Sequence, residues 1–339
     1  MSKMRPITPF RLAAAALGAL LLAAASPSAP QAAPAGKEMV YVFNLGSQDV
    51  SVIDPAARKV VRTHPLGVSV RWLSNEQNYW DGARIWTYTV EKGVSHAVVI
   101  DPRGFRVVKK IPLGAGPSHS AVLVRGNRFA LVNVAGENHI AVIDTAKLEV
   151  VRRIPTGAFP CDLDTTPDGR YLFTPERDQD TVARFDLRDF SLAGRLALEA
   201  GSRPHMLRVS PDGRRVWVQN ARAGTNTFLG ADPFRVEKTL RLDSVPVTNA
   251  FSPDGRFSYV TNMAGGTVSV VDRRSLKEVT RLTVGRAPAN VGFTSDGRFA
   301  YVSVTGRSAV AVIDARTHRL VDVIPVGRAP SGLLITSRF

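Results

Sequence analysis

The sequence predicts an all-β fold, a seven-bladed β-propeller built from four-stranded antiparallel blades. One unit of four short strands, separated by turn residues, is best preserved over residues 250–285. Degenerate repeats of this unit follow one another along the chain. An aspartate ends the third strand of each repeat, at intervals of 40 to 47 residues. Such a repeat length is typical of propeller blades. The seven aspartates are Asp54, Asp101, Asp144, Asp186, Asp232, Asp272 and Asp314.

The two ends of the repeat region are predicted to complete one blade together. The repeats begin with Met39–Asn44, the counterpart of a second strand, and the missing first strand is Gly332–Thr336 at the other end. Pairing of these N- and C-terminal strands would close the ring. Closure also removes two exposed sheet edges.

Within each unit the turn residues define the strands. A proline follows the fourth strand in six places and suits the start of the next first strand, because proline lacks a donor. Asp-Gly pairs join the first and second strands as tight hairpins, and the third-strand aspartates can cap the following turn. Acids that recur in most blades are therefore read as structural.

Two units depart from this pattern. The fifth is interpreted as having lost much of its third strand, Asn226–Asp232. The second, Val68–Leu113, is the longest and carries Trp72, Trp80 and Trp86. These aromatic residues indicate either a locally enlarged core or an aromatic platform beside the channel mouth.

The N-terminus has the composition of a targeting segment. Lys3, Arg5 and Arg11 flank the apolar run Leu12–Ala25, which is too short to span a bilayer comfortably. Residues 1–35 are predicted to be a signal peptide with a Pro/Ala linker, a retained anchor being the alternative, and residues 36–339 a single propeller domain. No later segment could cross a membrane. We therefore expect a periplasmic or secreted monomer.

Charge and cysteine content narrow the class of partner. The formal net charge is +15, and removal of residues 1–35 leaves +12. A basic surface attracts anions such as nucleic acid, lipid headgroups or an acidic protein partner. The single cysteine, Cys161, excludes an intramolecular disulfide.

Candidate ligands cluster where first strands begin. The loops from each fourth strand to the next first strand share one face with the loops between second and third strands. Directly after the prolines stand His119, Cys161, Asp162 and His205, on three successive units. Imidazole, thiolate and carboxylate suit zinc, copper or a haem iron, and His119 and His205 are the preferred metal ligands. The alternative is that each residue has an independent structural role.

A basic rim is predicted on the same face. Arg203, Arg286 and Arg328 precede prolines, Arg177 lies in a loop between second and third strands, and Arg71 with Trp72 takes the corresponding place in the second unit. The guanidinium fork suits carboxylate and phosphate. With Trp72 nearby, this rim could hold an anionic ligand or single-stranded nucleic acid. Solvated surface arginines are the alternative.

The string FSPDGRFSYVTNMAGGTVSVVD resembles the YVTN family of bacterial β-propellers, named for the tetrapeptide at Tyr259–Asn262. The likeness covers residues 38–339 and implies an exported, seven-bladed propeller of the YncE-like kind. Relatives of this family include haem d1-binding propellers and propeller lactonases, so the resemblance does not fix an activity.

No G-x-S-x-G, Walker, H-E-x-x-H or C-x-x-C-H motif is present. We therefore predict, first, a non-catalytic binding or scaffold protein that engages an anionic ligand or partner at the channel mouth. The second prediction is a haem- or metal-binding propeller of a periplasmic redox or cofactor-assembly system. The third is a lactonase-like hydrolase that uses Glu176, Arg177 and His205.

Overall fold

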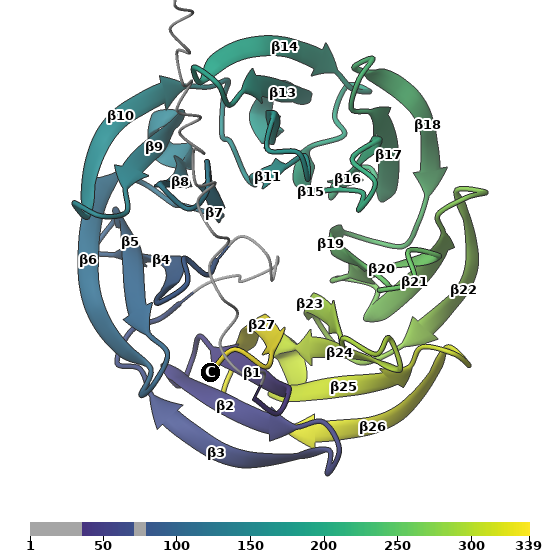
Figure 1. Ribbon diagram of the computed structural model, residues 1–339. Coiled ribbons are helices and arrows are strands. Elements are labelled where there is room, and N and C mark those ends of the chain that lie inside the picture. Colours follow the sequence, from purple (N-terminus) through teal and green to yellow (C-terminus); the bar gives the residue numbers. More distant parts are fainter. Residues whose placement is uncertain (1–35, 71–78) are drawn as a thin grey trace, which may run out of the picture. The chain divides into compact units, whose positions relative to one another are not determined.

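The computed structural model describes residues 36–70 and 79–339, and in it seven antiparallel sheets surround one central axis (Figure 1). The first three blades consist of β27 (Pro330–Thr336), β1 (Met39–Asn44), β2 (Asp49–Asp54) and β3 (Lys59–Pro65); of β4 (Ile85–Glu91), β5 (Val94–Asp101) and β6 (Arg106–Ala115); and of β7 (Ala121–Val124), β8 (Phe129–Val134), β9 (His139–Asp144) and β10 (Glu149–Pro155). The fourth and fifth consist of β11 (Asp164–Thr165), β12 (Tyr171–Glu176), β13 (Thr181–Asp186) and β14 (Ser191–Ala197), and of β15 (Pro204–Val209), β16 (Arg215–Asn220), β17 (Thr225–Gly230) and β18 (Arg235–Arg241). The last two consist of β19 (Pro246–Phe251), β20 (Phe257–Asn262), β21 (Thr267–Asp272) and β22 (Lys277–Thr283), and of β23 (Pro288–Phe293), β24 (Phe299–Val304), β25 (Ala309–Asp314) and β26 (Arg319–Pro325). The seven-bladed all-β prediction is confirmed.

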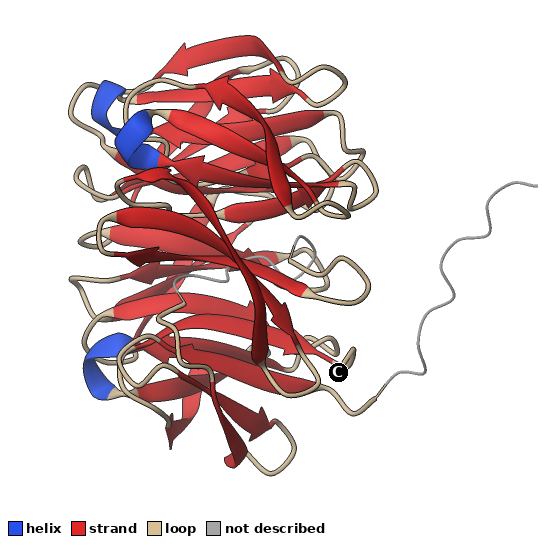
Figure 2. Ribbon diagram, turned by 90° about the vertical axis from the view of Figure 1, so that its left-hand side faces the viewer, coloured by secondary structure: helices blue, strands red, loops and turns tan. Residues whose placement is uncertain are grey.

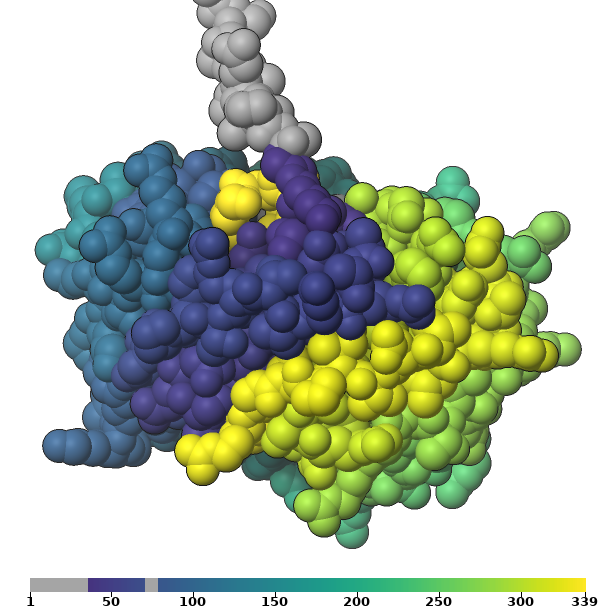
Figure 3. Space-filling view, turned by 90° about the horizontal axis from the view of Figure 1, so that it is seen from below, coloured from purple at the N-terminus to yellow at the C-terminus, as the bar shows by residue number. Residues whose placement is uncertain are grey.

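The predicted closure of the ring is confirmed. β27 pairs with β1 in antiparallel register, with Met39 opposite Thr336 and Val42 opposite Leu333. Figure 3 shows the purple start and the yellow end of the propeller side by side on its outer wall. Phe339 then packs against Tyr41, with ring centroids 5.3 Å apart.

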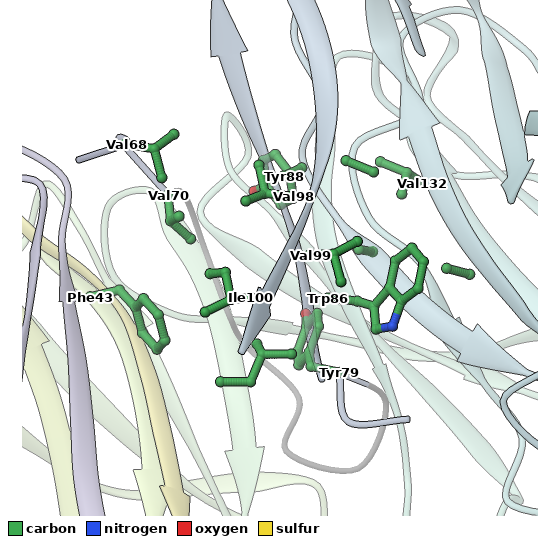
Figure 4. Packing of buried hydrophobic residues seen from close by; sticks show 14 of the residues in the cluster. Phe43, Val68, Val70, Tyr79, Trp86, Tyr88, Val98, Val99, Ile100 and Val132 are labelled. Atoms are coloured by element: carbon green, nitrogen blue, oxygen red, sulfur yellow. The ribbon is translucent and has the colours of Figure 1, made fainter. Parts of the chain in front are cut away.

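The second blade has three strands among the described residues, and Trp80 adds an isolated bridge to Ile85. Trp86, Tyr79 and Tyr88 are at most 2% exposed and pack with Val98 and Val99 between neighbouring blades (Figure 4). These aromatic residues therefore enlarge the core. Trp72 lies outside the described residues.

The prediction for the fifth blade is wrong. β17 is a complete third strand that pairs along its whole length with β16, Arg215 opposite Gly230 and Asn220 opposite Thr225. The position that aspartate occupies in other blades is Gly230, so Asp232 lies two residues too far. Polar Asn226 and Thr227 hid the strand because they bond to other polar side chains in the interior.

A left-handed residue precedes the proline that opens each of five first strands. Phe159, Arg203, Val245, Ala287 and Ala329 have φ between +48° and +58°. The carbonyl of each accepts a backbone N–H at 2.8–3.2 Å from the loop between the second and third strands of its own blade. The two kinds of loop are thereby fastened to each other on one face of the ring.

Each outermost strand carries a bulge. In all seven blades the pairing of the third and fourth strands skips one residue near the start of the fourth strand, and in the second blade it also skips Leu113. The skipped residues are Val61, Val108, Val151, Ala193, Glu237, Val279 and Val321. Because a bulge twists an edge strand out of register, the repeated bulge opposes edge-to-edge association of blades.

The two faces of the ring differ. Three 3₁₀ turns, η1 (Ala135–Glu137), η2 (Arg177–Gln179) and η3 (Thr305–Arg307), lie along the same side (Figure 2). We call this side, where the proline loops also lie, the loop face, and the opposite side, with the Asp-Gly turns, the hairpin face. No helix in residues 36–70 or 79–339 is long and apolar enough to span a membrane.

Candidate functional site on the loop face

Two histidines from non-adjacent blades meet at the channel mouth of the loop face. His119 precedes β7 in the third blade and His205 lies near the start of β15 in the fifth. Their ring centroids are 5.9 Å apart and the rings are nearly perpendicular. Both side chains are half-buried. The two imidazoles therefore lie beside each other at one level of the ring.

The loop that holds His119 is fixed by side-chain bonds. Asn133 of β8 accepts the backbone N–H of His119 at 3.1 Å and that of Ser120 at 2.7 Å, and donates to the carbonyl of Pro160 at 2.7 Å. Tyr88 donates its hydroxyl to the His119 carbonyl at 2.6 Å. Blades two, three and four therefore hold this one loop in place.

A pair of arginines lies beside the histidines. The guanidinium of Arg177 stacks over Phe159, 3.4 Å from its centroid, and Phe159 contacts His119 with centroids 5.5 Å apart. Asp178 accepts from Arg177 at 3.0 Å and from Arg203 at 3.0 Å. One carboxylate thus organises two guanidinium groups.

Cys161 and Asp162 lie deeper than the histidines. Cys161 is 0% exposed, and burial raises the pKa of its thiol to about 12, so it stays protonated at neutral pH. Asp162 is also 0% exposed and accepts from Arg208 Nη1 at 2.7 Å and from the Leu207 amide at 3.0 Å. Asp162 therefore bridges the fourth and fifth blades.

The His205 ring is neutral at physiological pH. Burial lowers the pKa of His205 to about 4; the nearby Asp162 carboxylate opposes this shift and Arg177 adds to it. A neutral imidazole keeps the lone pair that a metal or haem iron requires.

The two histidines do not make up a metal-ion site by themselves. No group of three or more His, Cys, Asp or Glu side chains in the described parts of the chain could hold a metal ion. A zinc site needs three or four protein ligands. Haem iron needs only axial ligands such as histidine, which His119 or His205 can supply.

Glu176 has a structural role. It is 0% exposed, and its carboxylate accepts the Gly157 amide and the Thr181 hydroxyl at 2.6 Å each, and two bonds from Arg195 at 2.6 and 3.0 Å. It occupies the strand end where Asn262 bonds Thr267 and Ser269 in the sixth blade. The Glu176 carboxylate, predicted to act with Arg177 and His205, is therefore already engaged by four hydrogen bonds.

The other predicted residues lie apart from this cluster or outside the described chain. Arg328 bonds to the Gly46 carbonyl at 3.1 Å in the first blade. Arg286 is exposed on the loop before β23, close to Gly306. Arg71 and Trp72 lie outside the described residues, as do residues 1–35 with the predicted signal peptide.

Sequence reasoning missed Phe159 and Asp178. Each occurs in one repeat only. At the position of Phe159, for example, most other repeats have alanine, valine or arginine before the proline. Asp178 directly follows Glu176-Arg177, and its position beside Arg203 depends on how neighbouring blades pack. The aromatic residue before Pro160 was the one available signal.

Comparisons with known proteins support the fold. Residues 241–338 match the family model of the Cytochrome D1 heme domain, which is less than a third of the chain. A search of curated proteins finds no match. The structure is similar to the periplasmic gluconolactonase of Pseudomonas aeruginosa, with 19% identity, 89% of this chain and 99% of that chain covered, and a TM-score of 0.71.

Two further solved structures are similar. A putative 6-phosphogluconolactonase from Bacteroides uniformis is 16% identical over 88% of this chain and 100% of that chain, with a TM-score of 0.74. The dihydro-heme d1 dehydrogenase NirN, in complex with DHE, is 18% identical over 89% of this chain and 75% of that chain, with a TM-score of 0.64. At identities this low, the TM-scores show that the fold is shared and nothing further.

Proposed function

We propose that this chain is an exported, monomeric binding protein of the YVTN type that holds an anionic ligand at the channel mouth of its loop face without transforming it. The observation that carries this proposal is the convergence of His119, His205, Arg177 and Arg203 from three successive blades. Two guanidinium groups organised by Asp178 are suited to a carboxylate or phosphate. The adjacent Phe159 offers an apolar surface for the rest of the ligand.

A second candidate function is binding of a haem-type cofactor. Its support is the match of residues 241–338 to the Cytochrome D1 heme domain, together with the neutral imidazole of His205. In this case His119 or His205 would ligate the iron, and Arg177 and Arg203 would neutralise acidic substituents of the macrocycle.

The test is a set of titrations of the mature chain. The probes are inorganic phosphate, citrate, a single-stranded oligonucleotide, metal-free protoporphyrin and ferric protoporphyrin. If the ligand is an anion, at least one probe binds, and Arg177→Gln weakens it by at least about tenfold, the value of one charge-assisted hydrogen bond. Binding also weakens with added salt. Arg222→Gln, an exposed arginine of the same face, is the matched control and leaves binding unchanged.

Comparison of the ferric with the metal-free porphyrin distinguishes the two candidate functions. Haem binding predicts that only the ferric porphyrin shifts its Soret band, and that His205→Ala or His119→Ala removes the shift. Anion binding without ligation predicts equal affinity for both porphyrins in wild type and His205→Ala. Failure of every probe, or an equal effect of Arg222→Gln and Arg177→Gln, would reject a specific anion site.

A further inference from the structure

A second group of arginines lies on the loop face, on the far side of the ring from the Arg177–Arg203 pair (Figure 1). Arg286 lies in the loop before β23, Arg307 in η3 and Arg328 in the loop before β27. The group therefore spans the seventh and first blades, and all three residues are exposed. We refer to Arg286, Arg307 and Arg328 as the arginine triad.

Arg286 and Arg307 lie against each other's loops. The Nε atom of Arg286 is 2.9 Å from the position that a Cβ atom on Gly306 would take. The Nη1 atom of Arg307 is 3.3 Å from the position of a Cβ atom on Gly285. Each arginine therefore covers the glycine that directly precedes the other. Because a side chain at either glycine would displace an arginine, the two glycines allow both arginines to lie side by side.

Hydrogen bonds hold the three loops of the arginine triad together. The amide of Gly306 donates to the carbonyl of Arg286 at 3.0 Å. The hydroxyl of Thr305 donates to the carbonyl of Pro330 at 2.7 Å. The turn η3 is therefore fastened on one side to the loop before β23 and on the other to the loop before β27. A site whose backbone is fixed in this way loses less entropy when a ligand binds.

The seventh blade lacks two acidic residues that the fourth blade has at equivalent positions. The amides of Asp178 and Gly306 donate to equivalent carbonyls of the loop before the first strand, at 3.2 and 3.0 Å. The carbonyls of Asp180 and Ser308 both accept the amide of the residue that follows the fourth strand, at 2.8 and 3.0 Å. Uncharged residues therefore stand in the seventh blade where the fourth blade has aspartates.

The charge of the arginine triad is consequently not compensated. None of its guanidinium groups forms an ion pair with a carboxylate of the described residues, whereas Asp178 pairs with both Arg177 and Arg203. Arg328 donates to a neutral group, the Gly46 carbonyl, at 3.1 Å. Like charges on neighbouring loops repel one another and create a positive potential. A bound anion would relieve this repulsion.

The number of guanidinium groups selects the class of anion. The planar fork of a guanidinium group matches the oxygens of a carboxylate or a phosphate. A single carboxylate offers one plane of oxygens and one charge, which suits one arginine. A diphosphate group carries several negative charges on two tetrahedral centres, so its oxygens can accept from forks that lie in different planes.

We propose that the arginine triad binds a diphosphate group, with Arg286 and Arg307 at one phosphate and Arg328 at the other. The site does not rest on the function proposed above, because it shares no residue with the site around His119 and His205. Inorganic pyrophosphate, nucleoside diphosphates and prenyl diphosphates all carry this group.

The test is calorimetric titration of the mature chain with inorganic pyrophosphate, ADP and isopentenyl diphosphate, without divalent cations. Orthophosphate, AMP and citrate are the comparison ligands. Pyrophosphate is expected to bind about tenfold or more tightly than orthophosphate, since the second phosphate adds at least one charge-assisted hydrogen bond. Equal affinity for the three diphosphates means that the site recognises the diphosphate group alone. Tighter binding of ADP or of isopentenyl diphosphate identifies the compound that carries it.

Three variants locate the binding site. Arg286→Gln and Arg307→Gln each weaken the binding of pyrophosphate by at least about tenfold. Ser308→Asp also weakens it, because it introduces a carboxylate where the fourth blade has Asp180. Both positions have a left-handed backbone, with φ +48° and +53°, which aspartate tolerates. Arg319→Gln, an exposed arginine of β26 in the same blade, is the matched control and leaves the affinity unchanged.

The thermal midpoint of each variant shows that it is folded. Arg177→Gln leaves the affinity for pyrophosphate unchanged, so the failure of this proposal and that of the function proposed above are distinguishable. Absence of pyrophosphate binding, or equal effects of Arg319→Gln and Arg307→Gln, would overturn the proposal. Tighter binding of orthophosphate or citrate than of pyrophosphate would also overturn it.

Discussion

The protonation of His205 depends on the groups that surround it in the site. Its ring lies between the imidazole of His119, the buried carboxylate of Asp162 and the guanidinium of Arg177. Burial favours the neutral ring, so the folded chain binds a proton at His205 less readily than the unfolded chain does. This difference links the stability of the protein to pH.

The pH dependence of stability should therefore contain a His205 component. Because its pKa is about 4 in the folded chain and about 6.5 when unfolded, its contribution is complete above pH 6.5 and is lost as pH falls toward 4. The loss amounts to at most about 3 kcal/mol. Urea unfolding of wild type and His205→Gln at several pH values measures it.

The difference between the two unfolding free energies isolates His205, because every other titrating group contributes to both proteins. This difference should rise steadily between pH 4 and pH 6.5 and then level off. A difference that does not vary with pH would mean that the His205 ring is as accessible to protons in the folded chain as in the unfolded one.

The sequence could predict which residues stand at the channel mouth, because a proline marks the start of six first strands. It could not predict which side chains would meet there. His119 is the second residue after its proline and His205 the first after its own, yet they touch across the intervening blade. That contact depends on the distance of each strand start from the central axis of the propeller, and a local sequence pattern does not determine this distance. Phe159 and Asp178 were missed for the same reason.

At the scale of elements, the loops before the first strands have a shared backbone geometry. Val245 has φ +56°, a region in which β-branched residues are strongly disfavoured. Its carbonyl nevertheless accepts the Met263 amide at 2.8 Å and fastens two loops together. The third blade uses Gly116 at the same place, with φ +86°. The sequence predicted these turns from their prolines, but the left-handed residue was not recognised.

Replacement of Val245 by glycine should stabilise the protein by about 1 kcal/mol. Glycine adopts positive φ without steric cost, and the relief of about 1–2 kcal/mol outweighs its entropic penalty of about 0.5–1 kcal/mol. Thermal and urea unfolding measure the change. Val247→Ala, two residues along and 1% exposed, is the matched control and should destabilise by about 2 kcal/mol through lost burial. A Val245→Gly variant that loses as much stability as this control would show that the backbone there is unstrained.

At the scale of the whole molecule, the ring is held by packing and by one seam. The only cysteine, Cys161, is buried and unpaired with another, so no covalent link joins the ends of the repeat region. The seam between β27 and β1 instead joins residues nearly three hundred positions apart. This closure was predictable from the sequence. The repeat region begins with the counterpart of a second strand and ends with an additional first strand, so the two complete one blade. The recess on the hairpin face, where Asp164 and Arg208 lie, was not predictable, because its lining combines strand ends from five blades.

A disulfide across the seam should lock the ring. Met39 and Thr336 are direct partners in the β1–β27 register and both are half-buried, so Met39→Cys with Thr336→Cys places two thiols opposite each other. The bridge would close a loop around almost the whole propeller, and a crosslink that closes so long a loop stabilises the folded protein by about 5 kcal/mol when its geometry is unstrained. The thermal midpoint of the oxidised double variant should exceed that of the same protein after reduction, and the reduced protein is the control.

Cys161 is 0% exposed and does not compete with the two introduced cysteines for disulfide formation. If the two cysteines fail to crosslink under oxidising conditions, or if crosslinking leaves the midpoint unchanged, then the strands of the seam are not paired in this register and the ring is closed in some other way.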